Sequence, residues 1–314
     1  MIGSDLQHFT GSYDGNGYSI SNFEYRKGGP FFKNPVSGIL DINGSLLRNN
    51  MNNVGLFGYL QGATLVNIKL IYPRIIVDVN NENTGALAGY SYGSIINDFT
   101  LLKSPSLPAL QASTIQGGKY VGGVVGTAQG SPLSNIQIVG YTKVWGTYAV
   151  GGVAGLVFNS PLTKSSFQFG DILPGATANC QLFGGLVGWA TSSNINQSYS
   201  KARVNVGINT GNIAGGLIGS MSGGGVISKT YATGEVFGKD FVGGLIGSMS
   251  GGEIKDSYAT GNVRAKSAVG GFVGRKGSGA VNANIYRSYS TGKVMGIDSV
   301  GGFIGSLWFN TSGT

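Results

Sequence analysis

The side chains that could perform acid–base chemistry are few and scattered. The chain has 314 residues, of which only 13 are Asp or Glu, and none of them forms an Asp-Asp or Asp-x-Asp pattern. Asp240 and Asp298 each lie three residues before a glycine pair, and Ser267 holds the equivalent place between them. In a stack of repeats these two carboxylates would be about 9.6 Å apart, a separation suited to an inverting glycosidase. We expect two solvated turn acids instead, because nothing around them indicates a general acid with a raised pKa.

The chain lacks the residues that a zinc site or an internal disulfide would need. The chain has one histidine, His8, and one cysteine, Cys180. Zinc sites need three or four His, Cys or carboxylate ligands, and a disulfide within the chain needs a second cysteine. The sequence therefore predicts no catalytic site, no metal site and no cofactor.

Basic residues gather toward the C-terminus. The formal net charge is +8, and residues 201–314 hold 11 bases and 5 acids, a net +6. From residue 264 on, Asp298 is the only acid beside six bases, namely Arg264, Lys266, Arg275, Lys276, Arg287 and Lys293. We predict a basic patch on the last repeats, which either keeps a weakly charged protein soluble or binds an anionic partner. No nucleic-acid-binding motif accompanies the bases, so an acidic glycan is the favoured ligand and no specific nucleic acid is expected.

The overall composition excludes most ordinary folds. Glycine accounts for 57 of 314 residues and charged residues for 11%, where a typical soluble domain has about 7% glycine and about 25% charged residues. The glycines have no Gly-X-Y period, and a 41% hydrophobic content argues against disorder. The 20 uncharged residues between Lys143 and Lys164 contain four glycines and a proline, so we expect no transmembrane segment.

A repeated core explains the glycines. Nine copies of a pattern related to VGGLIG are present: VGLFG at 54–58, TGALAG at 84–89, VGGVVG at 121–126, VGGVAG at 150–155, FGGLVG at 183–188, AGGLIG at 214–219, VGGLIG at 242–247, VGGFVG at 269–274 and VGGFIG at 300–305. The closing glycines run from Gly58 to Gly305, and 247 residues over eight intervals give about 31 per repeat. A period of this size indicates an array whose units bury their apolar faces by stacking.

Each repeat is β-structure. Short runs of Val, Ile, Tyr and Thr alternate with turn sequences such as SGG and ATG, and no stretch has helical apolar spacing. Residues 242–268 predict three strands, VGGLIGSM, EIKDSYAT and NVRAKSA. The sequence therefore predicts an all-β parallel β-helix of about nine rungs. A β-propeller is the alternative, but its blades need about 40–50 residues.

Charges alternate in two columns that stacking would create. One column contains Gln197, Lys229, Asp256 and Arg287, and the other contains Arg203, Glu235, Asn262 and Lys293. Stacked rungs would bring such side chains about 4.8 Å apart, where opposite charges attract. A propeller would leave this alternation unexplained.

Tyrosines and glycine pairs recur at fixed places in the rung. Tyr199, Tyr231, Tyr258 and Tyr289 are predicted to form either an aromatic ladder that holds rungs together or a row of exposed sugar-binding rings. We expect the glycine pairs to allow a positive φ and a close approach of neighbouring backbone.

The motifs also resemble a known family. The VGGLIG cores followed by SYATGNV (257–263), with FTGSYDGNGYSISNF (9–23), resemble the GLUG-motif repeats of large bacterial surface and secreted proteins. These include filamentous-haemagglutinin-like adhesins and the non-catalytic part of IgA-specific metallopeptidases. The resemblance implies a β-solenoid stalk or binding region of an extracellular protein. The peptidase activity does not carry over, because its H-E-x-x-H motif needs two histidines.

These observations define the expected organisation and function. Residues 1–50 are expected to form an N-terminal cap or first irregular rung, and residues 51–314 a GLUG-type solenoid excised from a longer chain with flanking domains. The favoured function is a non-enzymatic adhesin or stalk that is secreted or on the cell surface, with its export signal on a longer precursor and a host or neighbouring-cell ligand. A β-helical polysaccharide-processing domain, such as a phage tailspike, is the alternative.

Overall fold

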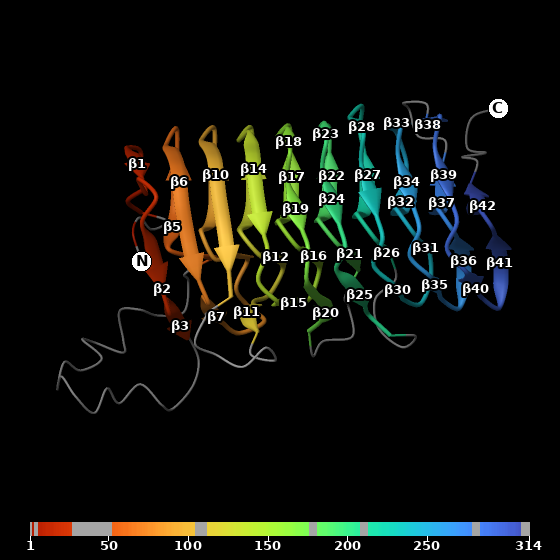
Figure 1. Ribbon diagram of the computed structural model, residues 1–314, viewed down its shortest axis with the longest axis horizontal. Helices are drawn as coiled ribbons and strands as arrows, with labels where there is room; N and C mark the ends of the chain where they lie inside the picture. The colour runs from red at the N-terminus through yellow and green to blue at the C-terminus, as the bar shows by residue number, and fades with distance from the viewer. Residues whose placement is uncertain are drawn as a thin grey trace.

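The chain winds into a parallel β-solenoid of about eight turns with roughly 31 residues in each turn (Figure 1). The computed structural model describes residues 2, 6–26, 52–103, 112–175, 181–207, 213–277 and 283–308. Every regular element within these ranges is a β-strand. The predicted fold class is therefore confirmed, and the propeller alternative is wrong, since each strand pairs in parallel with its equivalents in the preceding and following rungs.

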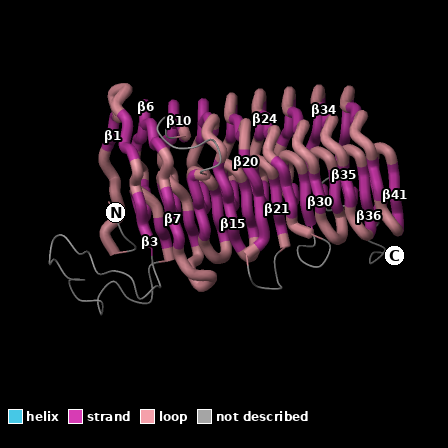
Figure 2. Tube along the Cα trace, turned by 60° about the horizontal axis from the view of Figure 1, so that its bottom comes forward, coloured by secondary structure: helices cyan, strands magenta, loops and turns pink. Residues whose placement is uncertain are grey.

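Each rung crosses four sheets in the order D, A, B and C (Figures 1 and 2). Sheet D contains β4 (Asn53–Val54), β8 (Asn83–Thr84), β12 (Tyr120–Gly122), β16 (Ala149–Gly151), β21 (Leu182–Gly184), β26 (Ile213–Gly215), β31 (Val242–Gly243), β36 (Ser267–Gly270) and β41 (Asp298–Gly301). Sheet A contains β5 (Phe57–Gln61), β9 (Ala88–Tyr92), β13 (Val125–Gln129), β17 (Ala154–Phe158), β22 (Val187–Thr191), β27 (Ile218–Ser222), β32 (Ile246–Met249), β37 (Val273–Gly277) and β42 (Ile304–Trp308).

The other two sheets complete the rung. Sheet B contains β1 (Ser12–Asp14), β2 (Ser19–Ser21), β6 (Thr64–Ile71), β10 (Ile95–Leu102), β14 (Leu133–Ile138), β18 (Leu162–Thr163), β19 (Ser166–Phe167), β23 (Ile195–Asn196), β24 (Tyr199–Ser200), β28 (Val226–Ser228), β29 (Tyr231–Ala232), β33 (Gly252–Lys255), β34 (Tyr258–Ala259), β38 (Ala283–Tyr286) and β39 (Tyr289–Ser290). Sheet C contains β3 (Glu24–Arg26), β7 (Arg74–Ile76), β11 (Ser113–Gln116), β15 (Thr142–Gly146), β20 (Gly170–Pro174), β25 (Arg203–Asn205), β30 (Val236–Phe237), β35 (Val263–Arg264) and β40 (Val294–Met295).

A regular rung has more strands than the three that its sequence predicts. The stretch VGGLIGSM bends at its glycine pair into β31 and β32, and EIKDSYAT bends at Asp256 into β33 and β34. The third stretch turns after β35 and enters β36 of the next layer. The strands β33 and β34 both belong to sheet B, so the five strands of this rung form the four sides of the coil.

The core is a set of apolar columns, because equivalent residues of successive rungs lie in register. Sheet C, for example, aligns Val204 with Val236 and Val236 with Val263, and all three are completely buried or nearly so. Sheets A, B and D contribute similar columns, including Ile218, Ile254 and Val242. Burying each such side chain contributes about 1.5–3 kcal/mol, so the repeat accumulates stability with every rung.

The glycine pairs are required by close approach and not by a left-handed backbone. A Cβ added to Gly243 would lie 2.0 Å from the carbonyl oxygen of Ile246 and 2.6 Å from the amide nitrogen of Gly274. No glycine of the pairs in the described residues is among those with a positive φ. The expected close approach is confirmed, and the expected positive φ is wrong at these positions.

Eight of the 16 non-glycine residues with a positive φ in the described part of the chain form a column in sheet B. Its members have φ between 42° and 56° and are Asn67, Asp98, Asn135, Lys164, Gln197, Lys229, Asp256 and Arg287. We call them the corner column. Asn and Asp tolerate this conformation best, and a bulky side chain there costs about 1–2 kcal/mol. The conformation bends the chain in the middle of sheet B at every rung.

Two serine ladders lie inside the coil. In the first, the backbone N–H of Ser94, Ser131 and Ser160 donates to the hydroxyl oxygen one rung further on, at 3.1, 2.9 and 3.0 Å. The serines of the second ladder come directly after residues of the corner column. There the backbone N–H groups of Ser165 and Ser257 donate to the hydroxyl oxygens of Ser198 and Ser288. These hydroxyls satisfy buried backbone groups where the strands bend.

The N-terminal segment lies on the first complete rung. β1 and β2 pair in parallel with β6, and β3 pairs with β7. Ile2 and Phe9 form bridges with Phe57 and Leu60 of β5. Residues 27–51, which include the rest of the expected cap, lie outside the described residues, as does Cys180. No helix in the described part of the chain is long and apolar enough to cross a membrane.

Candidate functional site

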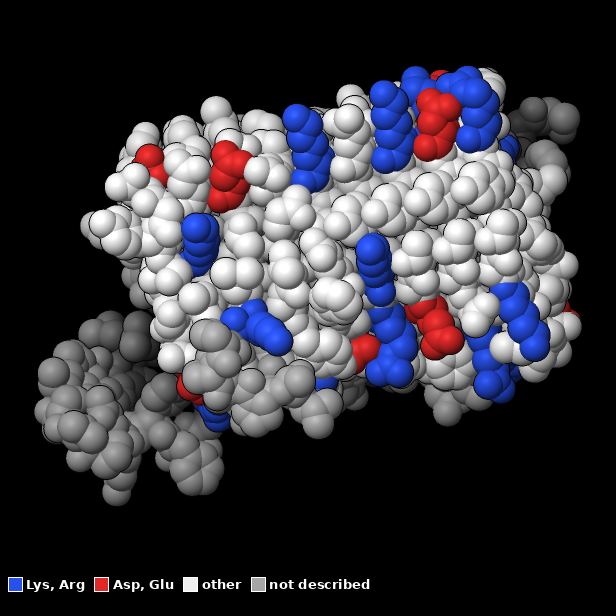
Figure 3. All heavy atoms as spheres, viewed as in Figure 1, with Lys and Arg blue, Asp and Glu red and all other residues white. Residues whose placement is uncertain are grey.

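The six bases of the predicted C-terminal patch lie on three different sheets. Arg264, Lys266 and Lys293 are exposed on or beside sheet C. Arg275 and Lys276 lie on β37 of sheet A, and Arg287 lies in the corner column of sheet B. The structure therefore brings together only the three bases near sheet C. Figure 3 shows most charged side chains of this face along its upper and lower edges, where some bases touch acids, with mainly uncharged surface between the two edges.

Two of the remaining bases are partly enclosed. The Arg275 guanidinium lies 3.9 Å from the centre of the Phe241 ring and donates to Ser248 Oγ at 3.2 Å. Burial lowers the pKa of Arg275 from its ordinary value. Lys276 shares a column with Met249, which is fully buried, and with Leu307. Both side chains therefore support packing near the end of the coil.

Arg287 forms an ion pair with the preceding member of the corner column. Its Nε and Nη2 donate to the two carboxylate oxygens of Asp256 at 2.6 and 3.0 Å. The hydrogen bond from Arg287 lowers the pKa of Asp256 below its ordinary value. The charge alternation predicted for this column is confirmed by this pair, and it leaves Arg287 with less positive charge to offer a ligand.

The other charged column has a member that the sequence did not reveal. Arg203 Nε donates to Asp171 Oδ1 at 2.8 Å, and Asp171 is 4% exposed. The Tyr141 hydroxyl also donates to this carboxylate. Burial, and after it the hydrogen bond to Asp171, raises the pKa of Tyr141 to about 12. This cluster links three successive strands of sheet C, since β15, β20 and β25 are neighbours.

The four repeated tyrosines form the predicted ladder on the outside of sheet B. Successive ring centres from Tyr199 to Tyr289 are 4.6, 5.0 and 5.3 Å apart, with interplanar angles of 8° or less. The amino group of Lys201 lies 5.6 Å from the Tyr199 ring centre. The rings stack on one another, so their faces are covered and only their edges and hydroxyl groups face outward. This arrangement supports the structural alternative, because sugar stacking needs an open ring face.

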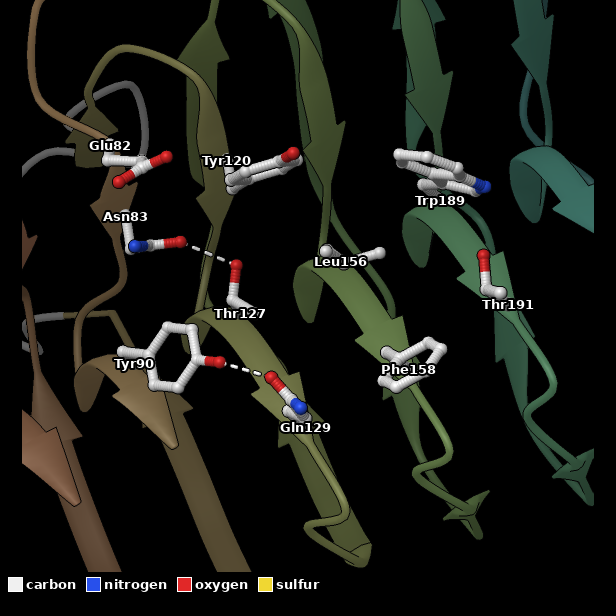
Figure 4. A pocket seen from close by; sticks show the side chains of 10 residues that line it. All are labelled: Glu82, Asn83, Tyr90, Tyr120, Thr127, Gln129, Leu156, Phe158, Trp189 and Thr191. Atoms are coloured by element: carbon white, nitrogen blue, oxygen red, sulfur yellow. Dashed lines mark hydrogen bonds between the residues drawn. The ribbon is translucent and has the colours of Figure 1, made fainter. Parts of the chain in front are cut away.

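A groove of about 380 Å³ lies on the outside of the coil where sheets D and A meet (Figure 4). Sheet A supplies two outward columns to it. The first is Tyr90, Thr127, Leu156 and Trp189, and the second includes Gln129, Phe158 and Thr191. Three more residues line the groove from the side of sheet D. Asn83 belongs to β8, Glu82 is the residue before β8, and Tyr120 belongs to β12. The groove crosses four rungs, which is about 14 Å along the axis of the coil.

Aromatic rings hold one another in place around the groove. In the view of Figure 4, Tyr120 and Trp189 lie above Thr127 and Leu156, and Tyr90 and Phe158 lie below them. The Tyr148 ring packs edge-to-face against the Tyr120 ring, with 5.7 Å between ring centres. It also packs against the Trp189 ring, with 6.3 Å between ring centres and an interplanar angle of 67°. Tyr90 also stacks on Tyr59, 4.9 Å away.

Polar groups of the groove are fixed by hydrogen bonds. Asn83 donates to Asn53 at 2.7 Å and accepts from the Thr127 hydroxyl at 2.5 Å. The Tyr90 hydroxyl donates to the Gln129 amide oxygen, and this bond orients the Gln129 NH₂ group away from Tyr90. Trp189 Nε1 donates to Ser222 Oγ, which also lies 2.9 Å from the Thr191 hydroxyl. The groove is thus prearranged to offer rings, amides and hydroxyls.

The groove is lined mainly by uncharged side chains. Among the ten described residues that line it, Glu82 carries the only charge, and its Oε1 is 3.3 Å from Lys119 Nζ. A glycosidase needs two carboxylates, and a lone paired one does not supply them. Within the described residues, no group of three or more His, Cys, Asp or Glu could hold a metal ion.

Sequence reasoning missed this groove because its residues do not repeat. One column runs Tyr, Thr, Leu and Trp along four rungs, and no two rungs carry the same residue. A repeat alignment discards such variation as noise. The available signal was the set of aromatic residues placed just after each core, at Tyr59, Tyr90, Phe158 and Trp189.

Comparison with known protein families then tests the suspected resemblance. Residues 242–264 match the GLUG motif. They cover β31 to β35 and include the stretch SYATGNV on which the resemblance rests. No curated protein and no solved structure matches the chain. The GLUG motif is therefore one complete rung of this solenoid.

Proposed function

We propose that this chain is a non-enzymatic adhesin or stalk region of a bacterial surface or secreted protein. The observation that carries the proposal is the uninterrupted parallel stack, in which a GLUG motif forms one rung. Eight steps of about 4.8 Å make a rod roughly 38 Å long, whose backbone groups are paired along its length. Such a rod can hold a binding surface away from its attachment point without needing a disulfide or a metal ion.

The positions of the acids support a non-enzymatic role. Asp298 aligns directly with Ser267, so Asp240 and Asp298 belong to rungs two steps apart. Asp240 lies 3.9 Å from the amino group of Lys239, and Asp298 is exposed in the last described rung. Asp240 is partly exposed and Asp298 is exposed, so neither carboxylate lies in an enclosed site.

A polysaccharide-processing domain is the competing proposal, because parallel β-helices can carry carboxylate pairs in grooves. Here the groove at sheets D and A has the single charged residue Glu82 among its ten described lining residues. This composition favours retention of a glycan over its hydrolysis.

The three exposed bases of sheet C support weak attraction to an acidic glycan. Arg264 lies over the Phe237 ring at 5.6 Å, and Lys293 is on the adjacent rung. We expect heparin retention at low salt to fall when Arg264, Lys266 and Lys293 are all replaced by Ala. Arg287→Ala should change retention less, because Asp256 already pairs with that guanidinium.

Two measurements test the proposed function. Antibodies against the solenoid should label intact cells of the source organism, and brief protease treatment should remove that label. The purified chain should release no reducing sugar from the polysaccharides of the cells to which it binds. Label that appears only after permeabilisation would contradict the surface location, and sugar release that Asp240→Asn or Asp298→Asn abolishes would contradict the non-enzymatic role.

A further inference from the structure

We propose that the groove at the junction of sheets D and A binds an uncharged oligosaccharide lying along the axis of the coil. This inference deepens the proposed adhesin function by naming a site and a ligand class, and it places the ligand away from the C-terminal bases. The shape, the rings and the polar groups of the groove favour such a ligand.

The rings supply the first part of the argument. Tyr120, Phe158 and Trp189 line the groove from three successive rungs, and Phe158 is 36% exposed. The C–H groups on the flat side of a pyranose are weakly positive, and they pack well on the electron-rich face of an aromatic ring. Unlike the tyrosine ladder of sheet B, these three rings come from different columns and do not stack on one another.

The polar groups supply the second part. Gln129 and Thr191 place an amide and a hydroxyl group beside the rings, and their hydrogen bonds to neighbouring side chains fix their orientation. Sugar hydroxyl groups both donate and accept hydrogen bonds, so they match amides and hydroxyls better than they match isolated charges. A groove lined mainly by apolar rings with a few fixed polar groups is typical of a ligand site.

The charge of the groove selects an uncharged glycan. Glu82 is paired with Lys119, so the ten described lining residues and this lysine together are electrically neutral. A phosphate or uronate chain needs basic partners, and the exposed bases of sheet C lie at least two rungs beyond the groove. A peptide strand could not extend sheet A here, because the backbone groups of β9, β13, β17 and β22 already pair with adjacent rungs.

The length of the groove indicates several sugar units. Its four rungs extend about 14 Å along the axis, and each rung adds a different set of ring and polar side chains about 4.8 Å further along. A straight, rigid chain of sugars with a repeating flat face fits this surface better than a branched or compact one.

The experiment measures binding of the complete chain to immobilised hexasaccharides of glucose, xylose and mannose, with heparin and a proline-rich peptide as separate probes. Trp189→Ala and Tyr120→Ala should each weaken hexasaccharide binding about tenfold, since each removes one ring from the site. Trp189→Phe should retain most of the affinity. The matched control is Tyr286→Ala, which removes a ring that is 45% exposed on β38, far from the groove.

A second readout does not depend on the stability of the alanine variants. The chain has three tryptophans, so Trp145→Phe with Trp308→Phe leaves Trp189 as the only fluorescent indole. Binding in the groove should change its emission in proportion to occupancy.

The outcomes separate this inference from the proposed function. Hexasaccharide binding that depends on Trp189 and Tyr120 supports the groove, even if labelling shows that the protein is not on the cell surface. Failure of every hexasaccharide to bind, equal binding by all variants, or binding of heparin or the peptide alone would overturn the groove assignment. None of those three results would contradict a surface stalk.

Discussion

Arg287 lies one rung after Asp256 in the corner column, and its guanidinium donates two hydrogen bonds to that carboxylate, at 2.6 and 3.0 Å. The two residues are 31 positions apart in the chain and share the same left-handed backbone conformation. Register alone brings them together, so this pair reports directly on the stacking of rungs.

Reversing the charge at this position should lower the melting temperature. In Asp256→Lys the new ammonium group would face Lys229 and Arg287 in the same column, and like charges on neighbouring rungs repel. In thermal melts, the variant's decrease in melting temperature should be smaller at high salt than at low salt, because salt screens the repulsion. The double variant Asp256→Lys with Arg287→Asp should recover most of the loss. Equal melting of all three proteins would contradict in-register pairing.

Acid should weaken the same pair. Because Arg287 holds the pKa of Asp256 below its ordinary value of 3.8, the stabilisation is present above that value and disappears as the pH falls through the lowered pKa. The melting temperatures of the wild type and of Asp256→Asn should therefore differ at neutral pH and converge in strong acid.

Gly243→Ala should be among the most damaging single changes in the chain. The added Cβ would lie 2.0 Å from a backbone oxygen, which cannot move without breaking the stack, so we expect a loss of about 3 kcal/mol or more. Gly224→Ala is the matched control, since its Cβ meets nothing within 4 Å and should change the urea midpoint little. Similar midpoints for the two variants would show that the glycine pair is not sterically required.

The first serine ladder offers a test of internal hydrogen bonding. Ser160→Ala removes the oxygen that accepts from the Ser131 N–H at 2.9 Å, in a fully buried place. Leaving this buried donor unpaired should cost about 1–3 kcal/mol in chemical denaturation. Ser12→Ala, at an exposed position of β1, should stay within about 0.5 kcal/mol of the wild type. A neutral Ser160→Ala variant would mean that the ladder does not stabilise the bend.

Tyr141 should give the solenoid a specific alkaline sensitivity. Its pKa is raised from 10 to about 12, so the unfolded chain loses this proton first, and the associated stability falls as the pH rises from 10 to about 12. Tyr141→Phe removes the part of the stability that depends on this proton. The urea midpoint of the variant should therefore fall less steeply over that range than the midpoint of the wild type, and parallel curves would contradict the assignment.

The repeat made the fold predictable, and the same regularity concealed the groove. Nine cores with one period determine which residues align, so the tyrosine ladder and the Asp256–Arg287 contact follow from the sequence. Bends inside a strand are harder to predict from the sequence. The corner column contains Asn, Asp, Lys, Gln and Arg, which share a backbone conformation but not one type of side chain. Asp171 was missed because its rung departs from the SYATG pattern, although its register with Arg203 is regular.

The residues of the groove were harder to predict than those of the core for a physical reason. Stacking requires the inward side chain to fit both neighbours, so inward columns stay apolar and similar from rung to rung. An outward position such as Thr127, Leu156 or Trp189 has no such requirement, and each rung can carry a different side chain there. The groove therefore lies where the outward columns depart from the repeat.

The four-sided coil also determines how the chain would respond to mechanical tension. β1 and β42 lie at opposite ends of the stack, so a force applied through the two ends of the chain loads the outermost rungs first (Figure 1). Each rung that detaches releases about 31 residues, or roughly 100 Å of extended chain. The solenoid would then lengthen in discrete steps while the remaining rungs stay folded.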